Sequence, residues 1–585
     1  MDFELHTADR IKRKYILREQ IASVFGGDLL SQLLTYRNIV DFADRDIFLH
    51  PSYNDHLHDP YLLRGMSQAV ARIKQALKHN EHIIVYADYD ADGIPGAVVL
   101  NDFFKLIGYS NFEIYIPHRH REGFGLHSEA IDTFVTPALL ISVDCGITDS
   151  AEVARAQNRG IDVIITDHHT APETLPSATA IVDPKQPGCE YPFRELCGAG
   201  IVFKLIQALL ATGEFKVSDG AEKWLLDMVG LATLSDMVPL VDENRVLAHY
   251  GLMVLRKSRR PGLRALLRLL RIDQRFLTED DIGFMITPRL NAASRMGEPI
   301  DAFTLLATTD TNIADAMAAH LNRINDERKG LVGSLVKEVK KIMIERAEHF
   351  KTRQVIVLGN PLWRPAILGL AAGSLAESAG KPVFLWGREE GVTIKGSCRS
   401  GGSASVVSVM KTAQEISAET FIDFGGHHFS GGFSLEPDKV HSLEDTLEKA
   451  FATVTSKTIT VGDEEKQQAN TVLLDGSLRL TDVRHEVYEL LEQLAPFGIA
   501  NPKPIFLFKD VMVKSLRQFG KLNNHLEIIV SQADADDVQA IRFFTLAESF
   551  KPLLEIGKKI DLVATMEKSF FRSRPTLRLR IVDIV

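Results

Sequence analysis

Acidic residues and a histidine pair follow short apolar runs at several points in the first half of the chain. The run IIVYA (83–87) leads into DYDADG, LLISV (139–143) leads into DCG, and VIIT (163–166) leads into DHH. A later stretch, LLDMVGLATLSDMVPL, carries another acidic motif near its end. The side chains placed in this way that could bind a metal or react are Asp88, Asp90, Asp144, His168, His169 and Asp236.

These side chains converge if the apolar runs are parallel strands, because ligands bind at the carboxyl ends of the strands in an open parallel sheet. Several carboxylates within a few ångströms repel one another and need a counter-charge. Oxygen ligands with an imidazole suit Mn²⁺ or Mg²⁺ better than structural zinc, and two such ions about 3.5–4 Å apart generate a hydroxide and clamp a phosphoryl oxygen. The sequence therefore predicts a two-ion site that hydrolyses phosphoesters or phosphoanhydrides.

Each acid taken alone also fits a structural role. An aspartate after a strand is commonly a helix cap or a turn residue, and a single histidine is commonly a core or surface residue. Four chain segments that all end in acids or a histidine pair make independent capping a poor explanation. Asp92, which precedes Gly93, and Asp167 are the two acids best suited to capping or to orienting a ligand.

The elements that would position these residues form an α/β pattern. Apolar runs alternate with helical stretches between residues 82 and 245, which predicts a parallel sheet. A proline-free stretch within 303–350 predicts a long connecting helix, and a second α/β region follows from 354 to about 455. Short alternating strands fill the C-terminal part and predict a small β-barrel.

Composition limits the class of protein. The 585 residues predict three or four domains, and 45% hydrophobic with 25% charged residues is typical of a globular chain. We see no membrane-spanning run, no signal peptide and no CxxC pair among the four cysteines, so a cytoplasmic protein without membrane contact is expected. The net charge of −10 argues against a surface coated for nucleic acid but allows a local basic channel.

The motifs DYDADG, VDCG, DHH and SDMVPL, in this order, resemble those of the DHH phosphoesterase superfamily. Further stretches are similar to blocks of the bacterial RecJ family of single-strand-specific exonucleases: PHRHREGFGL, TPRLNAASRMG, WRPAILGLAAGSL, KGSCRS, FGGHHFSGG and LAPFGIANPKPIF. The similarity extends from FLHP near residue 48 to the C-terminus.

The resemblance implies a role for each candidate. Asp88 would hold one metal ion, Asp90, His168 and Asp236 would hold the other, Asp144 would bridge them, and His169 would lie beside the phosphate. The residues implied to surround the 5′ end and the backbone phosphates are Arg119, Arg289, Ser397, Arg399 and, in the glycine-rich FGGHHFSGG block, His427.

The resemblance also implies the architecture, an α/β multidomain chain. We expect an N-terminal extension (1–75), a parallel-sheet DHH catalytic domain (76–302), a connecting helix (303–350), a second α/β domain of the DHHA1 type that binds substrate (351–458) and an OB-like β-barrel that binds single strands (459–585).

The implied activity is a Mn²⁺- or Mg²⁺-dependent 5′-to-3′ exonuclease that hydrolyses single-stranded DNA to 5′-mononucleotides in recombination and repair. A monomer is implied, with a helicase and a single-strand-binding protein as partners. Two alternatives remain open, a DHH phosphodiesterase for short oligonucleotides or cyclic dinucleotides and a non-catalytic single-strand-binding scaffold.

Overall fold

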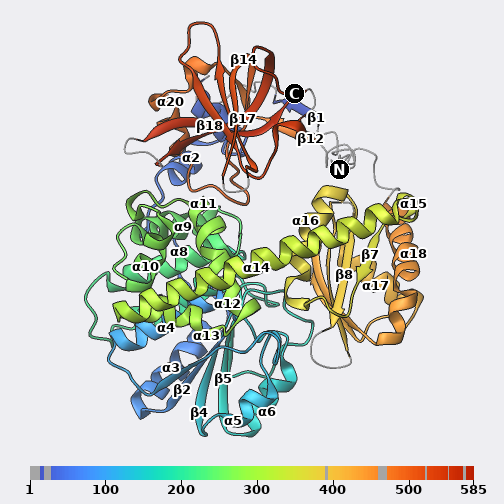
Figure 1. Cartoon of the computed structure of the whole chain (residues 1–585). Helices are drawn as coiled ribbons and strands as arrows, with labels where there is room; N and C mark the ends of the chain where they lie inside the picture. Colours follow the sequence, from blue (N-terminus) through green and yellow to red (C-terminus); the bar gives the residue numbers. More distant parts are fainter. Residues whose placement is uncertain are drawn as a thin grey trace. The chain divides into compact units, whose positions relative to one another are not determined.

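The computed structural model describes residues 14–18, 28–388, 393–402, 404–458, 471–520, 523–550, 553–570 and 575–585. Within these ranges the chain forms two compact units (Figure 1). Unit 1 contains Asp326–Leu473, and unit 2 contains Arg18–Asn325 together with Leu474–Val585. The expected catalytic domain and the expected barrel therefore belong to the same unit. Among the described residues, no helix is both long and apolar enough to cross a membrane.

The α/β part of unit 2, which is expected to be the catalytic part, is built on a parallel sheet with strand order β3-β2-β4-β5-β6. The chain runs from β2 to β3 on one side and then returns to β4 on the other, so the strand order reverses between β2 and β4. Such a switch point opens a crevice at the carboxyl ends of the two strands. The runs predicted at 83–87, 139–143 and 163–166 correspond to β2 His82–Ala87, β4 Ala138–Val143 and β5 Ile161–Thr166. The remaining strands of the sheet are β3 Phe112–Tyr115 and β6 Ala180–Val182.

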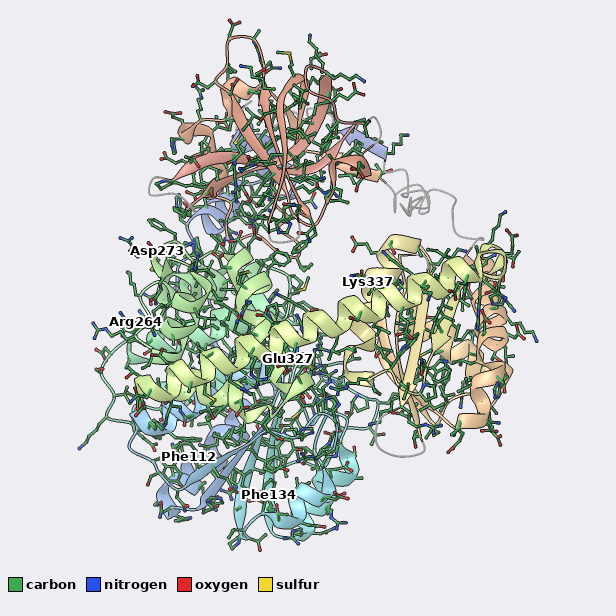
Figure 2. All side chains as sticks on the ribbon, viewed as in Figure 1. Phe112, Phe134, Arg264, Asp273, Glu327 and Lys337 are labelled. Carbon is green, nitrogen blue, oxygen red and sulfur yellow. The ribbon has the colours of Figure 1, made fainter. Side chains whose placement is uncertain are left out.

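Apolar side chains cover both faces of this sheet. Ile83 and Val85 pack on one face with helices α4 and α7, whereas Ile84 and Tyr86 pack on the other with α5 and α6. Burial on both faces explains why the strands are continuous apolar runs. Figure 2 shows Phe112 and Phe134 at this sheet, while Arg264 extends outward from α10. The helices here are α3 Met66–His79, α4 Gly93–Leu106, α5 Ser128–Thr133, α6 Ser150–Asn158, α7 Gly198–Ala211, α8 Leu226–Ser235, α9 Asp242–Leu255, α10 Pro261–Leu270, α11 Glu279–Asp281 and α12 Thr287–Met296.

The predicted helix over 303–350 is divided in the structure. Thr308 to Asp310 separate two helices, because Asp310 Oδ1 accepts hydrogen bonds from the N–H groups of Asn312 (2.7 Å) and Ile313 (3.1 Å) and caps the second of them. That second helix, α14, has 35 residues, its first part in unit 2 and its remainder in unit 1. The helices are α13 Ile300–Ala307, α14 Thr311–Glu345 and α15 Ala347–Thr352.

Unit 1 contains a mixed sheet with strand order β10-β11-β9-β8-β7, in which only β7 and β8 pair in parallel. The FGGHHFSGG block forms the β10–β11 hairpin. The elements of this unit after α15 are β7 Ile356–Gly359, α16 Pro365–Ala379, β8 Val383–Arg388, β9 Ile394–Arg399, α17 Val406–Ile416, β10 Asp423–His427, β11 Ser430–Leu435 and α18 Val440–Thr458. A short pair, β1 Lys14–Leu17 with β12 Thr471–Leu474, forms a separate ribbon.

The C-terminal part of unit 2 is a closed barrel. Its strands follow the order β13-β14-β15-β16-β18-β17, and β14 also pairs with β17, which closes the sheet. The barrel core includes Leu30, Leu33 and Leu34 from the N-terminal extension. The elements are α1 Leu29–Thr35, α2 Phe42–Leu49, β13 Gly476–Leu478, α20 His485–Glu492, β14 Phe506–Phe519, β15 His525–Ser531, β16 Val538–Arg542, β17 Lys559–Ser569 and β18 Thr576–Ile584.

Candidate active site

The DYDADG turn connects β2 to α4 and points its acids in different directions. Asp88 extends the strand pairing, because its N–H donates to Val143 O (3.0 Å). Asp90 Oδ1 accepts hydrogen bonds from the N–H groups of Asp92 (2.8 Å) and Gly93 (3.3 Å), as a residue at the start of a helix does. Asp92 instead reaches across to α7. The turn therefore presents alternate acids to different partners.

Asp92 is held by the first turn of α7. Its Oδ2 accepts from Gly198 N–H (2.6 Å) and its Oδ1 accepts from Ala199 N–H (2.8 Å). Only glycine fits at position 198 beside Asp144, because a Cβ there would lie 2.6 Å from Asp144 Cβ. Asp144 itself has a φ of 61°, a left-handed conformation that aspartate tolerates better than most residues. Gly198 thus contacts both acids, because its N–H donates to Asp92 and its lack of a side chain leaves room for Asp144.

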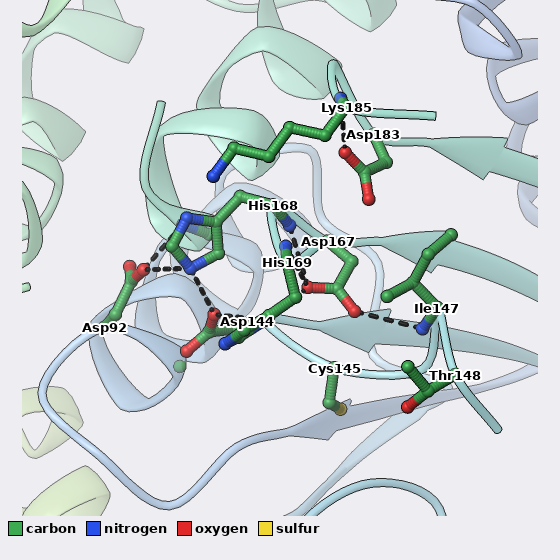
Figure 3. A network of polar contacts seen from close by, with 12 residues as sticks. Asp92, Asp144, Cys145, Ile147, Thr148, Asp167, His168, His169, Asp183 and Lys185 are labelled. Carbon is green, nitrogen blue, oxygen red and sulfur yellow. Dashed lines mark hydrogen bonds and ion pairs between the residues drawn. The ribbon is translucent and has the colours of Figure 1, made fainter. Parts of the chain in front are cut away.

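The histidine pair follows β5 and is oriented by Asp167. Asp167 Oδ1 lies 2.8 Å from His169 Nδ1 and also accepts from the N–H groups of His168 (2.7 Å) and His169 (3.1 Å). Its Oδ2 accepts from Ile147 N–H (3.0 Å). These contacts, drawn in Figure 3, confirm the interpretation of Asp167 as an orienting residue.

His168 Nε2 faces three carboxylates. It lies 3.1 Å from Asp144 Oδ1, 3.8 Å from Asp92 Oδ2 and 3.8 Å from Asp236 Oδ2. Figure 3 shows the imidazole between Asp92 and Asp144. Burial lowers the pKa of His168 to about 3, and the positive charge of His169 acts in the same direction. The ring is therefore neutral near pH 7, as a metal ligand must be.

The candidate ligands form groups that either contain Asp144 or lie next to it. Asp88, Asp90 and Asp144 form one group, and Asp92, His168 and Asp236 form another. In each group, one ligand atom from every residue lies within 4.8 Å of the others. Asp144 also groups with His168 and His169, so it adjoins both sets.

The grouping differs from the expected one at Asp90. We expected Asp90 with His168 and Asp236, but the structure places Asp92 there and leaves Asp90 beside Asp88. The reason is the turn, because Asp90 folds back to cap α4 whereas Asp92 extends to α7. The Asp92 side chain thus makes no capping hydrogen bond to α4, the helix that it precedes, and instead accepts from the first N–H groups of α7 as a member of the cluster.

The acids of this cluster carry a large electrostatic cost. Burial raises the pKa of Asp88 and Asp144 well above its usual range, and the charges of neighbouring acids add to the effect. Burial, together with the charge of Asp90, raises the pKa of Asp92 to about 7. The pKa of Asp236 rises to about 8 for the same reasons. In the metal-free protein these carboxyls hold protons at pH values where ordinary aspartates are charged.

The donor set fits divalent cations. Among the described residues, the buried Oδ1 of Asp88 has no hydrogen-bond partner, which leaves it available to a ligand. Carboxylate oxygens with one neutral imidazole are ligands that suit Mn²⁺ and Mg²⁺. One group would use Asp88, Asp90 and Asp144, and the other Asp92, His168 and Asp236. Bound there, such ions would supply a hydroxide at neutral pH and polarise a phosphoryl oxygen.

His169 differs from His168 in charge. Burial opposes its protonation, but the hydrogen bond and the charge of Asp167 outweigh this and raise the pKa of His169 to about 9. It is therefore an imidazolium near pH 7. The Phe124 ring lies beside it, with 5.4 Å between ring centroids. A cationic donor next to Asp144 can hold or protonate an oxygen of a bound phosphate.

The structure places two of the predicted phosphate-binding arginines in unit 2. The guanidinium of Arg119 lies over the Tyr89 ring, 5.0 Å from its centroid, and its charge favours the ionised form of Asp88. Arg289 is buried on α12, where its Nη1 donates to Met285 O (2.6 Å) and its Nε to Asn322 Oδ1 (2.9 Å). The charge of Arg119 thus acts on the acid cluster, whereas Arg289 makes structural contacts, and phosphate binding by either stays a prediction.

The remaining predicted contacts belong to unit 1. Ser397 and Arg399 lie on β9, opposite Gly432 and Ser430 of β11. Arg399 Nη1 donates to Cys398 O (2.8 Å), and its guanidinium lies against α16, where a Cβ at Gly369 would be 3.1 Å from Nη2. The side chain of His427 lies outside the described residues.

Sequence reasoning missed the full role of Asp92 and the contribution of α7. The two-residue spacing of the acids in DYDADG showed three aspartates but not the directions of their side chains. Gly198 and Ala199, whose N–H groups hold Asp92, carry no side-chain chemistry that a motif search would notice.

Family models match three parts of the chain. The DHH family, N-terminal domain matches residues 82–233, the DHHA1 domain matches 352–453 and the RecJ OB domain matches 474–583. Each matched range lies within the segment expected for it.

The chain is also similar to curated proteins named single-stranded-DNA-specific exonuclease RecJ. It is 33% identical to the protein of Bacillus subtilis (strain 168) over 590 residues, covering 100% of this chain and 70% of that protein. It is 29% identical to the protein of Haemophilus influenzae over 585 residues, covering 98% and 99%.

Solved structures agree with these relatives. The crystal structure of RecJ in complex with Mn²⁺ from Thermus thermophilus matches with a TM-score of 0.76 at 25% identity, covering 98% of this chain and 80% of that chain. The crystal structure of exonuclease RecJ bound to manganese matches with a TM-score of 0.57 at 30% identity, covering 67% and 95%. The similarity spans the acid cluster, the second α/β domain and the barrel alike, and the chain belongs to the RecJ family of the DHH superfamily.

Proposed function

We propose that this protein is a metal-dependent exonuclease that releases 5′-mononucleotides from the 5′ end of single-stranded DNA, in recombination and repair. The observation that carries the proposal is the pair of acid groups adjoining Asp144 at the switch point of the parallel sheet. The relatives' activity on single-stranded DNA, stated in their names, supports the choice of substrate.

One set of side chains binds the metal ions and another binds the phosphate. Asp88, Asp90 and Asp144 hold one divalent ion, and Asp92, His168 and Asp236 hold the other. In the free protein their protons compete with these ions, so loading with metal accompanies proton release.

The cationic side chains hold the phosphate rather than the metal. His169, oriented by Asp167, donates to an oxygen of the scissile phosphate, and Arg119 holds the phosphate at the 5′ end. Ser397, Arg399 and His427 contact the following backbone phosphates. Arg289 orders α12 through its contacts to Met285 and Asn322.

The setting of the reaction forms part of the proposal. Because the substrate is single-stranded, we assign a helicase and a single-strand-binding protein as partners that supply it, and we place the protein in the cytoplasm as a monomer. The cysteines are buried free thiols, the ordinary state in a reducing compartment.

Digestion of strands labelled at either end tests the proposal. With Mn²⁺ or Mg²⁺, we expect a label at the 5′ end to appear first as a mononucleotide, and we expect chelator or a duplex substrate to stop release. Asp144→Ala should abolish release and leave strand binding largely intact. Faster cleavage of a two-nucleotide than of a forty-nucleotide substrate would favour a short-oligonucleotide enzyme, and undiminished cleavage by Asp144→Ala would show that the site is elsewhere.

A further inference from the structure

The loop 494–501 of the barrel, which we call the bracing loop, contacts the segment that follows Asp236. It lies between α20 and β14 and includes much of the LAPFGIANP motif. We propose that the bracing loop positions Asp236 for metal binding and thereby links the barrel to one of the two ion sites. This inference rests on the proposed metal role of Asp236.

The segment after Asp236 is strained and needs external support. Asp236 ends α8, and Met237 follows with a φ of 59°. A left-handed conformation costs a non-glycine residue roughly 1–2 kcal/mol and persists only where the surroundings hold it. Met237 is 66% exposed, so packing of its side chain cannot supply that support. The support must come from the backbone on either side.

Hydrogen bonds fix the far end of this segment. Leu240 N–H donates to Ile499 O of the bracing loop (2.8 Å), and Asn244 Nδ2 donates to Pro239 O (3.0 Å). Leu240 is 1% exposed, and a Cβ at Gly498 would lie 2.8 Å from its Cδ1. The loop therefore sets the position of Leu240 both by a hydrogen bond and by close packing.

The bracing loop is itself tied to rigid groups. Asn501 is fully buried, and its Nδ2 donates to Leu494 O and Pro496 O, both at 2.8 Å. Its Oδ1 accepts from Arg37 Nε (2.8 Å), and Gly498 N–H donates to Asn501 O (2.9 Å). These bonds close the loop into a tight turn.

Arg245 of the catalytic part adds a second anchor. This buried guanidinium donates to Leu494 O (3.1 Å) and Ala495 O (3.2 Å) from Nη1 and Nη2, and to Phe48 O (2.6 Å) from Nε. Because one arginine of α9 holds carbonyls of the barrel and of the N-terminal extension, the loop cannot move independently of the catalytic part. A fixed loop fixes Leu240, and Leu240 lies only four residues beyond Asp236.

Weakening the brace should loosen one ion site selectively. Gly498→Ala presses on the Leu240 side chain, whose Cδ1 would lie 2.8 Å from the new Cβ, and Asn501→Ala removes the bonds that close the turn. Asp236 would then sample positions away from Asp92 and His168, while Asp88 and Asp90 would keep theirs. Outer contacts of this kind change metal affinity roughly ten- to a hundred-fold, and we expect that loss for one of two bound Mn²⁺ ions. The matched control is Gly476→Ala, because its added Cβ would meet only Phe506 of the barrel, at an ordinary 3.7 Å.

Two measurements test the inference without relying on activity. Calorimetric titration of the metal-free full chain with Mn²⁺ measures metal binding, and amide hydrogen exchange at Leu240 measures whether its N–H stays bonded to Ile499 O. Asp236→Asn should lose one of the two binding events, and adding Gly498→Ala to it should weaken Mn²⁺ no further. Retention of both events by Asp236→Asn would refute the metal site itself. If Asp236→Asn loses one event but Gly498→Ala and Asn501→Ala bind both ions as the wild type does, the bracing role is overturned. Equal weakening of both events would also overturn it, since a positioning role predicts an effect at one site.

Discussion

Asp236→Asn should stabilise the metal-free protein and reduce its response to Mn²⁺. Burial, with the charges of Asp92 and Asp90, raises the pKa of Asp236 to about 8, whereas an aspartate in an unfolded chain titrates near 3.9. The folded state therefore binds this proton more tightly than the unfolded state. Stability is highest below pH 4 for this group and falls as the pH rises from about 4 to 8. Above pH 8 the metal-free protein bears the full free-energy cost of the ionised Asp236 carboxylate.

The magnitude follows from the pKa difference. About four units at 1.36 kcal/mol each correspond to about 5 kcal/mol. Water screens part of this cost because the Asp236 side chain is partly exposed, so we expect asparagine at 236 to recover about 2 kcal/mol at pH 8.5. The side chain is 27% exposed, so the new amide can hydrogen-bond to water and adds no buried unpaired donor.

Thermal unfolding in EDTA and in Mn²⁺ measures both effects. In EDTA at pH 8.5 the variant should unfold at a higher temperature than the wild type. Mn²⁺ should raise the wild-type midpoint more, because the stabilisation that a ligand gives the folded state grows with the logarithm of its affinity. Asp219→Asn, at an exposed position, serves as the control for loss of one negative charge. A lower midpoint in EDTA, together with an undiminished shift in Mn²⁺, would refute the electrostatic reasoning.

Three further outcomes follow from the same structure. Asp167→Asn should lower kcat and move the alkaline decline of activity from about pH 9 to lower pH, because the raised pKa of His169 depends on Asp167; a pH–rate profile that does not move would contradict this. Mn²⁺ affinity should increase from pH 6 to pH 8, since burial raises the pKa of Asp92 to about 7 and its proton competes with the ion; calorimetry in buffers of different ionisation heat would reveal the released proton. Lys204→Ala should destabilise the protein by about 3–5 kcal/mol in urea unfolding, because it leaves the fully buried Glu243 without its cationic partner at 2.7 Å; a change below about 1 kcal/mol would contradict this.

The parallel sheet was predictable because the pattern of apolar residues within each strand indicates it. Each strand is buried on both faces, so it reads as a continuous apolar run, and the acids that follow β2 and β4 mark the carboxyl end of the sheet. The convergence of Asp88 and Asp144 on one crevice follows from strand order alone. That much of the site required no knowledge of side-chain directions.

The division of ligands between the two ion groups was not predictable in the same way. Whether Asp90 or Asp92 joins His168 depends on which acid caps α4 and which reaches α7, and the two are alike in composition and spacing. The partners of Asp92 lie 106 and 107 residues away along the chain. A contact of that kind is set by helix packing, which the local sequence does not specify.

The packing of the N-terminal extension was likewise not predictable from the local sequence. Residues 1–75 were expected as one segment, yet Leu30, Leu33 and Leu34 complete the core of the C-terminal barrel. Nothing in the helical spacing of LLSQLLT indicates which apolar surface it will cover. The barrel core is therefore completed by residues from distant parts of the chain.

The active site combines several unfavourable features that divalent ions can offset together. Asp144 and Met237 adopt left-handed backbone conformations at or beside candidate ligands, and burial raises the pKa of Asp144 and Asp236. Such strain and buried charge persist only where surrounding structure holds them. The N–H groups at the start of α7 hold Asp92, and the bracing loop holds the segment after Asp236. Holding these ligands in place before metal binds lowers the stability of the metal-free protein, but the ions then need not order their ligands. Neutralising a ligand carboxylate should therefore raise the stability of the metal-free protein and lower its affinity for metal.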